Sequence, residues 1–430
     1  MCRGKFHKML KINNLRAFLR PFLGWRLAVF CAFLVLAALV WVFQGRSPEA
    51  KAPSSCAEEA VWEPMGHSRL LHLGHRCGNG EIEVLSFIGK DTVVYRLTVE
   101  KPVRRVVILS SAQIGFMTRL GIADRIVGVG EGKYVVDSAL YARVAAGEVA
   151  EVGNGPTISL EKVLALKPDL VMTFATGGSY DDYDRLQTLG IPLLVTSEWQ
   201  EDNPLAKIEW IKLYGMLFGV DSLASAIYEQ TKADYLSSLA PSAGSGQASR
   251  LSSNKGGVAG VAPAEGVADA AGGRSEGETS PRVIAGMAYG GVWYAPGGKS
   301  YTAHLVKAAG GRYLWEGDTT RELKLSLEEV MLLADSADVW VNPGAFGSVE
   351  EVLATEPRVK ALKAFRDKRV CQNDGRKGPG GGNDFYESAV ARPVKLIADL
   401  HGCLFAENGS VSGGQSGQAG ASWYRNIFNF

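Results

Sequence analysis

A pattern of a capped helix followed by an apolar strand occurs twice in this chain, at residues 158–171 and 325–341. In each copy a Ser stands two places before a Glu, which is Glu161 in the first copy and Glu328 in the second. Apolar residues then recur at helical spacing, and an Asp precedes a β-branched run that is typical of a buried parallel strand. The pattern predicts two similar α/β lobes. Capped helices that lead into strands are also common by chance in α/β proteins, so the repeat needs support from the rest of the chain.

The size and charge of the chain narrow the classes of protein and partner. The 430 residues, 46% hydrophobic and 21% charged, are enough for two or three domains with proper cores. The net charge is +1, and the sequence contains no zinc-finger, helix-turn-helix or RNP-like pattern. No nucleic-acid partner is therefore expected.

The N-terminal region has the pattern of an export or membrane signal. Residues 1–26 carry seven Lys or Arg and no acidic residue, and residues 27–43 then contain no charge. Because positive flanks stay on the inner side of the membrane, the bulk of the chain is expected on the periplasmic or other extracytoplasmic face. Residues 27–43 can be a retained anchor, giving a membrane contact through the N-terminal segment, or a cleaved signal. A lipid on Cys56 is a third alternative.

The six cysteines, at positions 2, 31, 56, 77, 371 and 403, show no paired spacing typical of a zinc or redox motif. In an exported protein Cys56 could pair with Cys77, and Cys371 with Cys403. Free buried thiols explain the second pair equally well.

The order of apolar patterns predicts an α/β architecture with a helical connection. Strand, helix and strand follow one another from residue 104, and a helical pattern runs from residue 203 to 240 with one break at Gly219. Its second part is 19 residues, roughly 28 Å, which suits either a strut between lobes or an ordinary surface helix. The predicted buried stripe of this helix consists of Leu223, Ile227, Tyr228, Thr231 and Tyr235. The predicted segments are a basic flank (1–26), a signal or anchor (27–43), a linker (44–60), a β-rich leader (61–103), an N-terminal α/β lobe (104–202), an inter-lobe helix region (203–240), a disordered insertion (241–280), a C-terminal α/β lobe (281–405) and a flexible tail (406–430).

Particular stretches of these lobes resemble the periplasmic substrate-binding proteins of ABC importers for iron siderophores, haem and cobalamin. The resemblance lies in residues 106–111, 120–129, 159–171, 189–192, 209–212 and 218–219 of the first half, and in residues 300–301, 310–311, 326–341, 383–387 and 392–393 of the second. It implies two Rossmann-like lobes with parallel sheets, joined by a long helical strut, with ligand in the cleft between them. It also implies delivery to an ABC permease dimer, with Glu161 and Glu328 as the docking carboxylates. The alternative for each Glu is a capping role at its own helix terminus.

The loops at the strand ends are expected to meet the ligand. They combine aromatic with basic and amide side chains, which suits a small-molecule metal chelate or macrocycle with anionic groups through stacking and bidentate contacts. For any single aromatic residue, packing in the core is an equally good explanation. The candidate ligand-binding residues are Tyr134, Asn154, Tyr180, Trp199, Trp293, Tyr294, Arg321, Phe346, Arg376, Asn383 and Tyr386.

Other site chemistries are disfavoured. The glycine run at 378–382 is followed by no Lys-Ser or Lys-Thr, so it is not a phosphate-binding loop. The lobes contain only His304 and His401, too few for a bare-metal site, and no cofactor is expected. No nucleophile and base motif is present, so a binding protein is predicted rather than an enzyme. The leading hypothesis is capture of an iron siderophore, with haem or cobalamin as other ligands. The rivals are a membrane-tethered ligand sensor or interaction module, and a chelatase or nitrogenase-like enzyme.

Overall fold

The computed structural model describes residues 60–76, 78–88, 91–100, 102–154, 157–174, 176, 181, 183–239, 280–315, 317, 319–333, 335–406 and 422–429. All of them belong to the second of two compact units, residues 59–430. The predicted anchor at 27–43, Cys56, Cys77 and Tyr180 lie outside the described residues, as does the predicted insertion at 241–280 apart from its last residue. Among the residues described, no helix is long and apolar enough to cross a membrane.

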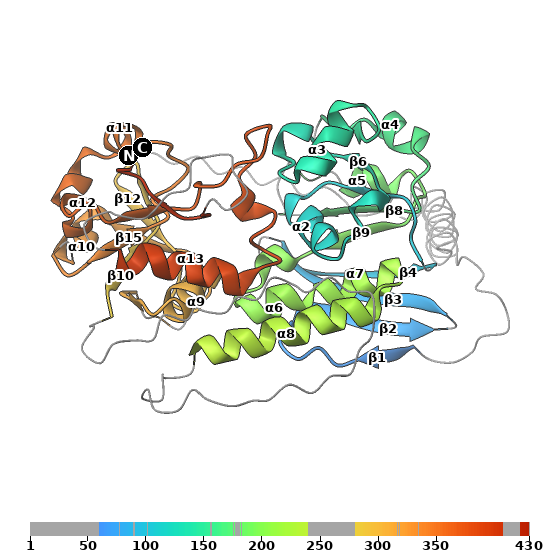
Figure 1. The fold of residues 1–430 in the computed structure, drawn as a ribbon, viewed down its shortest axis with the longest axis horizontal. Coiled ribbons are helices and arrows are strands. Elements are labelled where there is room, and N and C mark those ends of the chain that lie inside the picture. Colours follow the sequence, from blue (N-terminus) through green and yellow to red (C-terminus); the bar gives the residue numbers. More distant parts are fainter. Residues whose placement is uncertain are drawn as a thin grey trace, which may run out of the picture. The chain divides into compact units, whose positions relative to one another are not determined.

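The N-terminal lobe is built on a five-stranded parallel sheet (Figure 1). Its strand order is β7 (Ala150–Glu151), β6 (Ile126–Val129), β5 (Val106–Ile108), β8 (Leu170–Phe174) and β9 (Leu193–Thr196). All of these strands except β7 are rich in Val, Ile and Leu, as expected where helices cover both faces of a parallel sheet. The helices of this lobe are α2 (Ser111–Arg119), α3 (Ser138–Ala145), α4 (Leu160–Ala165) and α5 (Tyr183–Gln187).

The C-terminal lobe repeats this plan with an added antiparallel strand. Its main sheet has the order β13 (Arg312–Tyr313), β10 (Arg282–Ala285), β15 (Val339–Val341), β16 (Val370–Gln372) and β17 (Arg425–Asn426), of which only β17 is antiparallel. A second sheet orders β11 (Met287–Tyr289), β12 (Val292–Ala295) and β14 (Leu323–Ser326), all antiparallel. The helices are α9 (Tyr301–Ala308), α10 (Leu327–Leu332), α11 (Val349–Thr355), α12 (Lys363–Arg366) and α13 (Pro393–Phe405).

The two copies of the sequence repeat occupy corresponding places in the two sheets. Ser159 and Ser326 cap α4 and α10, their side chains accepting from the backbone N–H three residues later at 3.3 and 3.2 Å. Helix α4 leads to β8, and helix α10 leads to β15. In each sheet this strand pairs with the strand that comes first along the chain, β5 in one lobe and β10 in the other. The predicted fold class, two α/β lobes with parallel sheets, is confirmed.

The leader forms a separate antiparallel sheet of β1 (Val61–Glu63), β2 (Leu71–Arg76), β3 (Asn79–Ile88) and β4 (Asp91–Val99). Its β3 and β4 pack beside β9 of the N-terminal lobe. The turn before β2 is held by the buried carboxylate of Glu209, which accepts from the backbone N–H groups of residues 66, 67 and 68 at 2.7 to 2.8 Å. The leader is thereby joined to the helices that connect the lobes.

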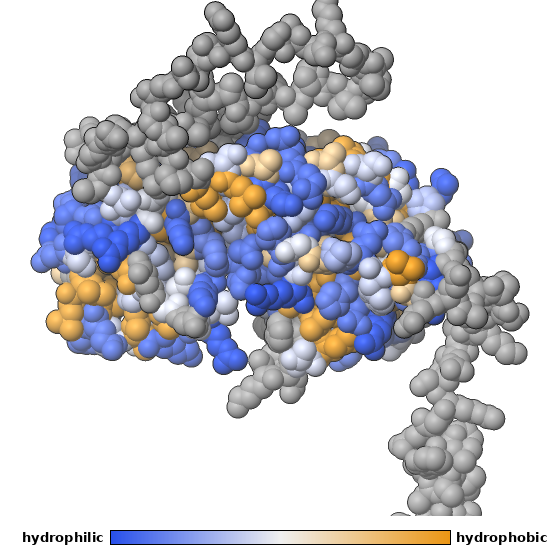
Figure 2. Space-filling view, turned by 90° about the horizontal axis from the view of Figure 1, so that it is seen from below, coloured by the Kyte–Doolittle hydropathy of each residue, from blue (hydrophilic) through white to orange (hydrophobic). Residues whose placement is uncertain are grey.

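Three helices make the connection: α6 (Pro204–Glu209), α7 (Ile211–Phe218) and α8 (Asp221–Leu239). Gly219 separates α7 from α8 with φ +71°, the left-handed conformation typical of a glycine that ends a helix. The 19-residue α8 contacts both α7 and α13 of the C-terminal lobe, as a strut would (Figure 1). On the face from which Figure 2 is drawn, hydrophilic side chains cover most of the middle, with smaller hydrophobic areas interspersed. One detail of the predicted stripe is wrong: Leu223 is 43% exposed, and Ala224 is buried instead.

The C-terminal end departs from the prediction of a flexible tail. Residues 422–429 carry β17 and bury Trp423, Tyr424 and Ile427 in the C-terminal lobe. Aromatic residues after a glycine-rich stretch can therefore be core residues, because burying them offsets the entropy of ordering a short segment.

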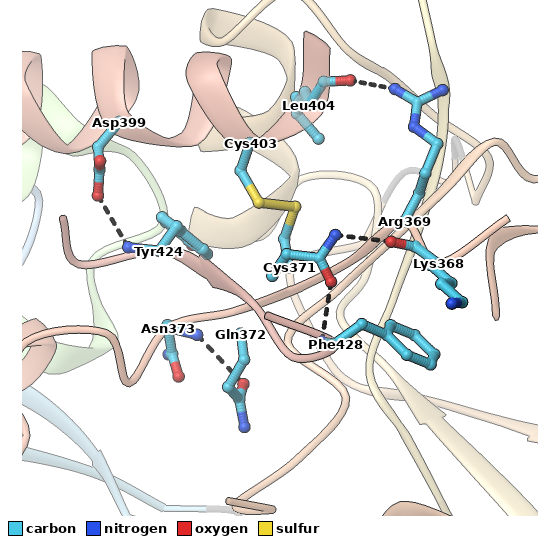
Figure 3. The surroundings of a disulfide bond; sticks show 11 residues. Lys368, Arg369, Cys371, Gln372, Asn373, Asp399, Cys403, Leu404, Tyr424 and Phe428 are labelled. Carbon is cyan, nitrogen blue, oxygen red and sulfur yellow. Dashed lines mark hydrogen bonds between the residues drawn. A yellow bond between two sulfur atoms is a disulfide. The ribbon is translucent and has the colours of Figure 1, made fainter. Parts of the chain in front are cut away.

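A disulfide joins Cys371 of β16 to Cys403 of α13, next to this C-terminal segment (Figure 3). Of the two alternatives that the sequence left open for this pair, a disulfide and two free buried thiols, the structure contains the disulfide. The strand and the closing helix of the C-terminal lobe are linked covalently, across a sequence separation of 32 residues.

Candidate functional site

A pocket lies at the carboxyl ends of β5 and β6 in the N-terminal lobe, where ligands are bound in open α/β sheets. Two of the predicted ligand residues, Tyr134 and Asn154, line it. Tyr134 stands in a short 3₁₀ helix, η2 (Gly132–Tyr134), and is 48% exposed, so its ring is available for stacking. The full lining is Ile108, Leu109, Ser110, Ser111, Ile114, Val129, Gly130, Glu131, Tyr134, Val135 and Asn154.

Asn154 is held close to the backbone of β6. A Cβ atom on Gly130 would lie 2.0 Å from the Asn154 side-chain oxygen, so any other residue at position 130 would displace the Asn154 side chain. This oxygen is buried and accepts no hydrogen bond within the described residues. A buried acceptor without a donor is unusual in a folded protein, and here it lies at a pocket that a ligand could enter.

A loop of the C-terminal lobe packs against this region. We call residues 374–388 the binding loop. A Cβ on Gly378, Gly380 or Gly382 would lie 2.5 to 2.7 Å from backbone atoms of residues 133–136, and the Gly382 N–H donates to the carbonyl of Lys133 at 3.1 Å. The glycine run at 378–382 therefore allows the backbones of the two lobes to approach each other closely.

Glu387, at the end of the binding loop, makes a second contact between the lobes. Its two carboxylate oxygens accept from the backbone N–H groups of Val136 and Asp137, at 2.8 and 2.7 Å, just before α3. The side chain is 1% exposed. Burial raises the pKa of Glu387 to about 8, against the opposing effect of the two N–H donors. This residue was not among those predicted from sequence, because its role depends on a partner 250 positions away.

The binding loop also carries three predicted ligand residues, Arg376, Asn383 and Tyr386. The Arg376 guanidinium forms an ion pair with the buried Asp384 at 2.8 Å. Asn383 caps the short helix η6 (Asp384–Tyr386), accepting from the Phe385 N–H at 3.0 Å. Tyr386 is 58% exposed. Arg376 and Asn383 thus have structural partners within the loop, whereas Tyr386 presents a largely open ring.

The charges beside the pocket are already partly balanced. Lys133 forms an ion pair with Glu131 at 2.6 Å, and this hydrogen bond raises the pKa of Lys133. Its ammonium also lies 4.8 Å from the centre of the Tyr134 ring. The Lys133 ammonium and the Tyr134 ring thus lie together beside the pocket.

Of the predicted ligand residues that the structure describes, only Tyr134 and Asn154 line this pocket. Trp199 is 44% exposed in η4 (Glu198–Gln200), Tyr294 is half-buried on β12 near Lys324, Arg321 is exposed, and Phe346 is half-buried at the edge of the C-terminal core. The prediction for Trp293 is wrong: its ring is fully buried, its Nε1–H donates to the carbonyl of Ala285 at 3.0 Å, and it packs on Trp340. Its place in a strand of the core explains its presence, as packing does for many aromatic residues.

The buried polar contact on the strut side was also missed from sequence. Lys207 of α6 lies 3.9 Å from the centre of the Tyr301 ring, at the start of α9 in the other lobe. Burial lowers the pKa of Lys207 to about 8, while the carboxylates of Glu198 and Glu201 act in the opposite direction. The helical pattern of this segment did not predict that the Lys207 side chain would be buried, since Lys in the first turns of a helix is usually exposed.

Glu161 and Glu328 are both exposed on the second residue of their helices. The capping alternative does not apply to either. In α10 the capping box is completed by Glu329, whose carboxylate accepts from the Ser326 N–H at 2.7 Å. Glu328 pairs only loosely with Arg358, at 3.3 Å, and its side chain is 77% exposed.

No group of three or more His, Cys, Asp or Glu side chains suited to a metal ion occurs among the described residues. The three leader histidines have separate partners: His67 contacts the Tyr228 hydroxyl, His72 contacts Glu83 and His75 contacts Glu63.

The comparisons with known proteins agree with the architecture. Residues 106–245 match the family model described as periplasmic binding protein. Over this segment the chain is similar to the periplasmic binding proteins, and the resemblance drawn from its sequence is confirmed.

Similar proteins include an uncharacterised lipoprotein of Methanocaldococcus jannaschii, 20% identical over 319 residues, covering 71% of this chain and 66% of that protein. A vitamin B12-binding protein of Vibrio parahaemolyticus is 27% identical over 114 residues, covering 26% of this chain and 39% of that protein. The chain thus spans just under two thirds of the first relative and well under half of the second. A solved structure of an ABC-type Fe3+-hydroxamate transport system from Saccharomonospora viridis has a TM-score of 0.48 and 20% identity, covering 73% of this chain and 97% of that one.

Proposed function

We propose that this protein captures a metal chelate at the extracytoplasmic face of a membrane and delivers it to an ABC permease. The observation that carries the proposal is the pocket at the ends of β5 and β6, two of whose lining residues, Tyr134 and Val135, belong to the segment against which the binding loop of the other lobe packs. We expect a ligand at this place to reach the binding loop as well as the N-terminal lobe. The ligand class rests on the residue types at the pocket and on the likeness to a vitamin B12-binding protein.

The chemistry of the pocket favours a chelate over a bare ion. Tyr134 at the pocket and Tyr386 on the binding loop offer largely exposed rings. The Asn154 amide at the pocket and the Lys133 ammonium beside the Tyr134 ring offer polar contacts. Rings and a few polar groups suit a rigid organic ligand with anionic substituents. An iron siderophore is the first candidate, and haem and cobalamin are the others.

A binding assay with one matched pair of variants tests this proposal. Full-length protein is titrated with a ferric hydroxamate siderophore, a ferric catecholate siderophore, hemin and cyanocobalamin. We expect binding of at least one, weakened about tenfold or more by Tyr134→Ala, since loss of one stacked ring costs about 1 to 2 kcal/mol. Trp62→Ala removes an aromatic ring of similar exposure, 44%, from the leader and serves as control. Binding of none of the four would rule the proposal out.

The proposed delivery step uses Glu161 and Glu328 as contacts to the permease dimer. Two exposed carboxylates at corresponding points of two similar lobes suit a partner with two-fold symmetry and basic residues at its surface. Their freedom from a capping role supports a contact with another molecule.

Charge reversal tests this step. Replacing both glutamates by Lys should abolish ligand uptake by cells and leave ligand binding unchanged. The control is Asp184→Lys with Glu350→Lys, which also places Lys in the first turns of two exposed helices, α5 and α11. This control introduces the same unfavourable interaction between Lys and a helix N-terminus. A loss of uptake that occurs in both double variants would therefore be due to destabilised helices and not to lost contact with the permease. Unchanged uptake in the Glu161 and Glu328 variant would remove these residues from the proposal.

The location proposed is the periplasmic or extracytoplasmic side, with the membrane contact through residues 27–43 or a lipid on Cys56. The similarity to an uncharacterised lipoprotein of Methanocaldococcus jannaschii supports the lipid alternative. Radiolabelled palmitate or glycerol incorporation, compared with a Cys56→Ser variant, distinguishes the two.

A further inference from the structure

The C-terminal residues 422–429, which we call the C-terminal strap, lie against the binding loop. The strap adds β17 to the edge of the main sheet, pairing Asn426 with Cys371 and Arg425 with Gln372. Tyr424 and Ile427 are fully buried, and the backbone N–H of Tyr424 donates to Asp399 of α13 at 2.8 Å (Figure 3). These contacts fix the strap firmly to the C-terminal lobe.

The strap holds the first stem of the binding loop. The Arg425 guanidinium donates to both carboxylate oxygens of Asp374, at 2.7 and 3.0 Å. The carbonyl of Trp423 accepts from the Gly375 N–H at 3.0 Å. The contact is close enough that a Cβ on Gly375 would lie 2.6 Å from the carbonyl oxygen of Ser422.

The strap also holds the second stem. The indole Nε1–H of Trp423 donates to Asp384 at 2.9 Å, and Asp384 has no exposed surface. The same carboxylate binds Arg376 at 2.8 Å and the Ser388 hydroxyl at 2.6 Å. The guanidinium of Arg376 lies 5.5 Å from the centre of the Trp423 ring. A single buried carboxylate thus joins the strap to both stems of the loop.

From these contacts we infer that the C-terminal strap is a positioning element for the binding loop, with the Trp423 indole acting through Asp384. The loop reaches the other lobe at two places, the Gly382 N–H to Lys133 and the Glu387 carboxylate to the N–H groups before α3. By holding both stems, the strap keeps these inter-lobe contacts formed. None of the strap residues lines the pocket.

The inference has a test that needs no ligand. Trp423→Phe keeps an aromatic ring and removes only the N–H donor to Asp384. Phe428→Leu is the matched control, because Phe428 is on the same strap but packs on Phe365, away from the loop. Hydrogen exchange of the backbone amides that bridge the lobes is measured in full-length protein, at Val136, Asp137 and Gly382.

We expect exchange at these three amides to be about tenfold faster in Trp423→Phe, the effect of losing one hydrogen bond to a charged group. Phe428→Leu should leave the three amides as in the wild type, even where it lowers the melting temperature. Unchanged exchange in Trp423→Phe would overturn the inference. Equal acceleration in both variants would do the same, because it would mark a general loss of stability.

The consequence for ligand binding rests on the proposed function. For whichever of the four chelates binds the wild type, Trp423→Phe should raise the dissociation constant about tenfold, and Phe428→Leu should not. If no chelate binds, the proposed function fails, while the exchange result still decides the role of the strap. If Trp423→Phe accelerates amide exchange but leaves the dissociation constant unchanged, the strap stabilises the contact between the lobes, and its proposed effect on ligand binding is overturned.

Discussion

The disulfide between Cys371 and Cys403 permits a quantitative prediction for the C-terminal lobe. In the chain-entropy model a cross-link stabilises by limiting the unfolded chain, and the effect grows with the logarithm of the loop length. A sequence separation of 32 residues corresponds to about 4 kcal/mol in the free energy of unfolding at 25 °C. Both sulfur atoms belong to buried residues, so the double variant Cys371→Ala with Cys403→Ala also loses a small packing contribution.

Urea unfolding of full-length protein, followed by tryptophan fluorescence, measures this difference. The C-terminal lobe has buried reporters in Trp293 and Trp340. Wild type and double variant are each unfolded with and without reductant. We expect the oxidised wild type to be about 4 kcal/mol more stable than the double variant, and the reduced wild type to resemble it. The double variant should not respond to reductant, which separates this bond from any other pair of cysteines. A difference below about 1 kcal/mol between the oxidised proteins would refute the reasoning.

Three further predictions concern single residues. Burial raises the pKa of Asp338, but hydrogen bonds from Arg282 bring it down to about 2, so its stabilising effect is present above about pH 4 and is lost as the pH falls toward 2. Asp338→Asn should cost about 2 kcal/mol at pH 7 and flatten the acid limb of a stability profile; an unchanged limb would contradict this. Because the pKa of Glu387 is raised to about 8, wild-type stability should fall between about pH 4.5 and 8. Glu387→Gln should remove this slope and accelerate amide exchange at the lobe contact, and persistence of the slope would assign it elsewhere. Gly382→Ala would place a Cβ 2.6 Å from the carbonyl oxygen of Tyr134, so it should open the lobe contact and weaken chelate binding, whereas wild-type affinity would show that the loop yields freely.

The fold could be predicted from the sequence because its signals are local. The capped helices at residues 158–171 and 325–341 and the apolar runs after them define strands in corresponding places of two sheets. The break at Gly219 was visible as well, since a glycine in a helical pattern favours a left-handed end. Helix capping and strand patterning depend on neighbours within a few residues, so one sequence is enough to reveal them.

The site could be predicted only in part because its contacts are long-range. Tyr134 and Asn154 lie at strand ends, where the topology of parallel sheets places ligands, and they line the pocket. Glu387 and Trp423 act through partners that are far apart in the chain, and their positions follow no periodic pattern. Trp293 was misassigned since an aromatic residue in a loop-like context has no local mark that separates core from surface.

The most direct measurement is a crystal structure of the protein with the chelate that it binds in solution. The account predicts electron density for the chelate at the ends of β5 and β6, in contact with Tyr134 and Asn154 of one lobe and with the binding loop of the other, near Tyr386. Density at another place on the molecule, or a chelate that touches only one lobe, would contradict it.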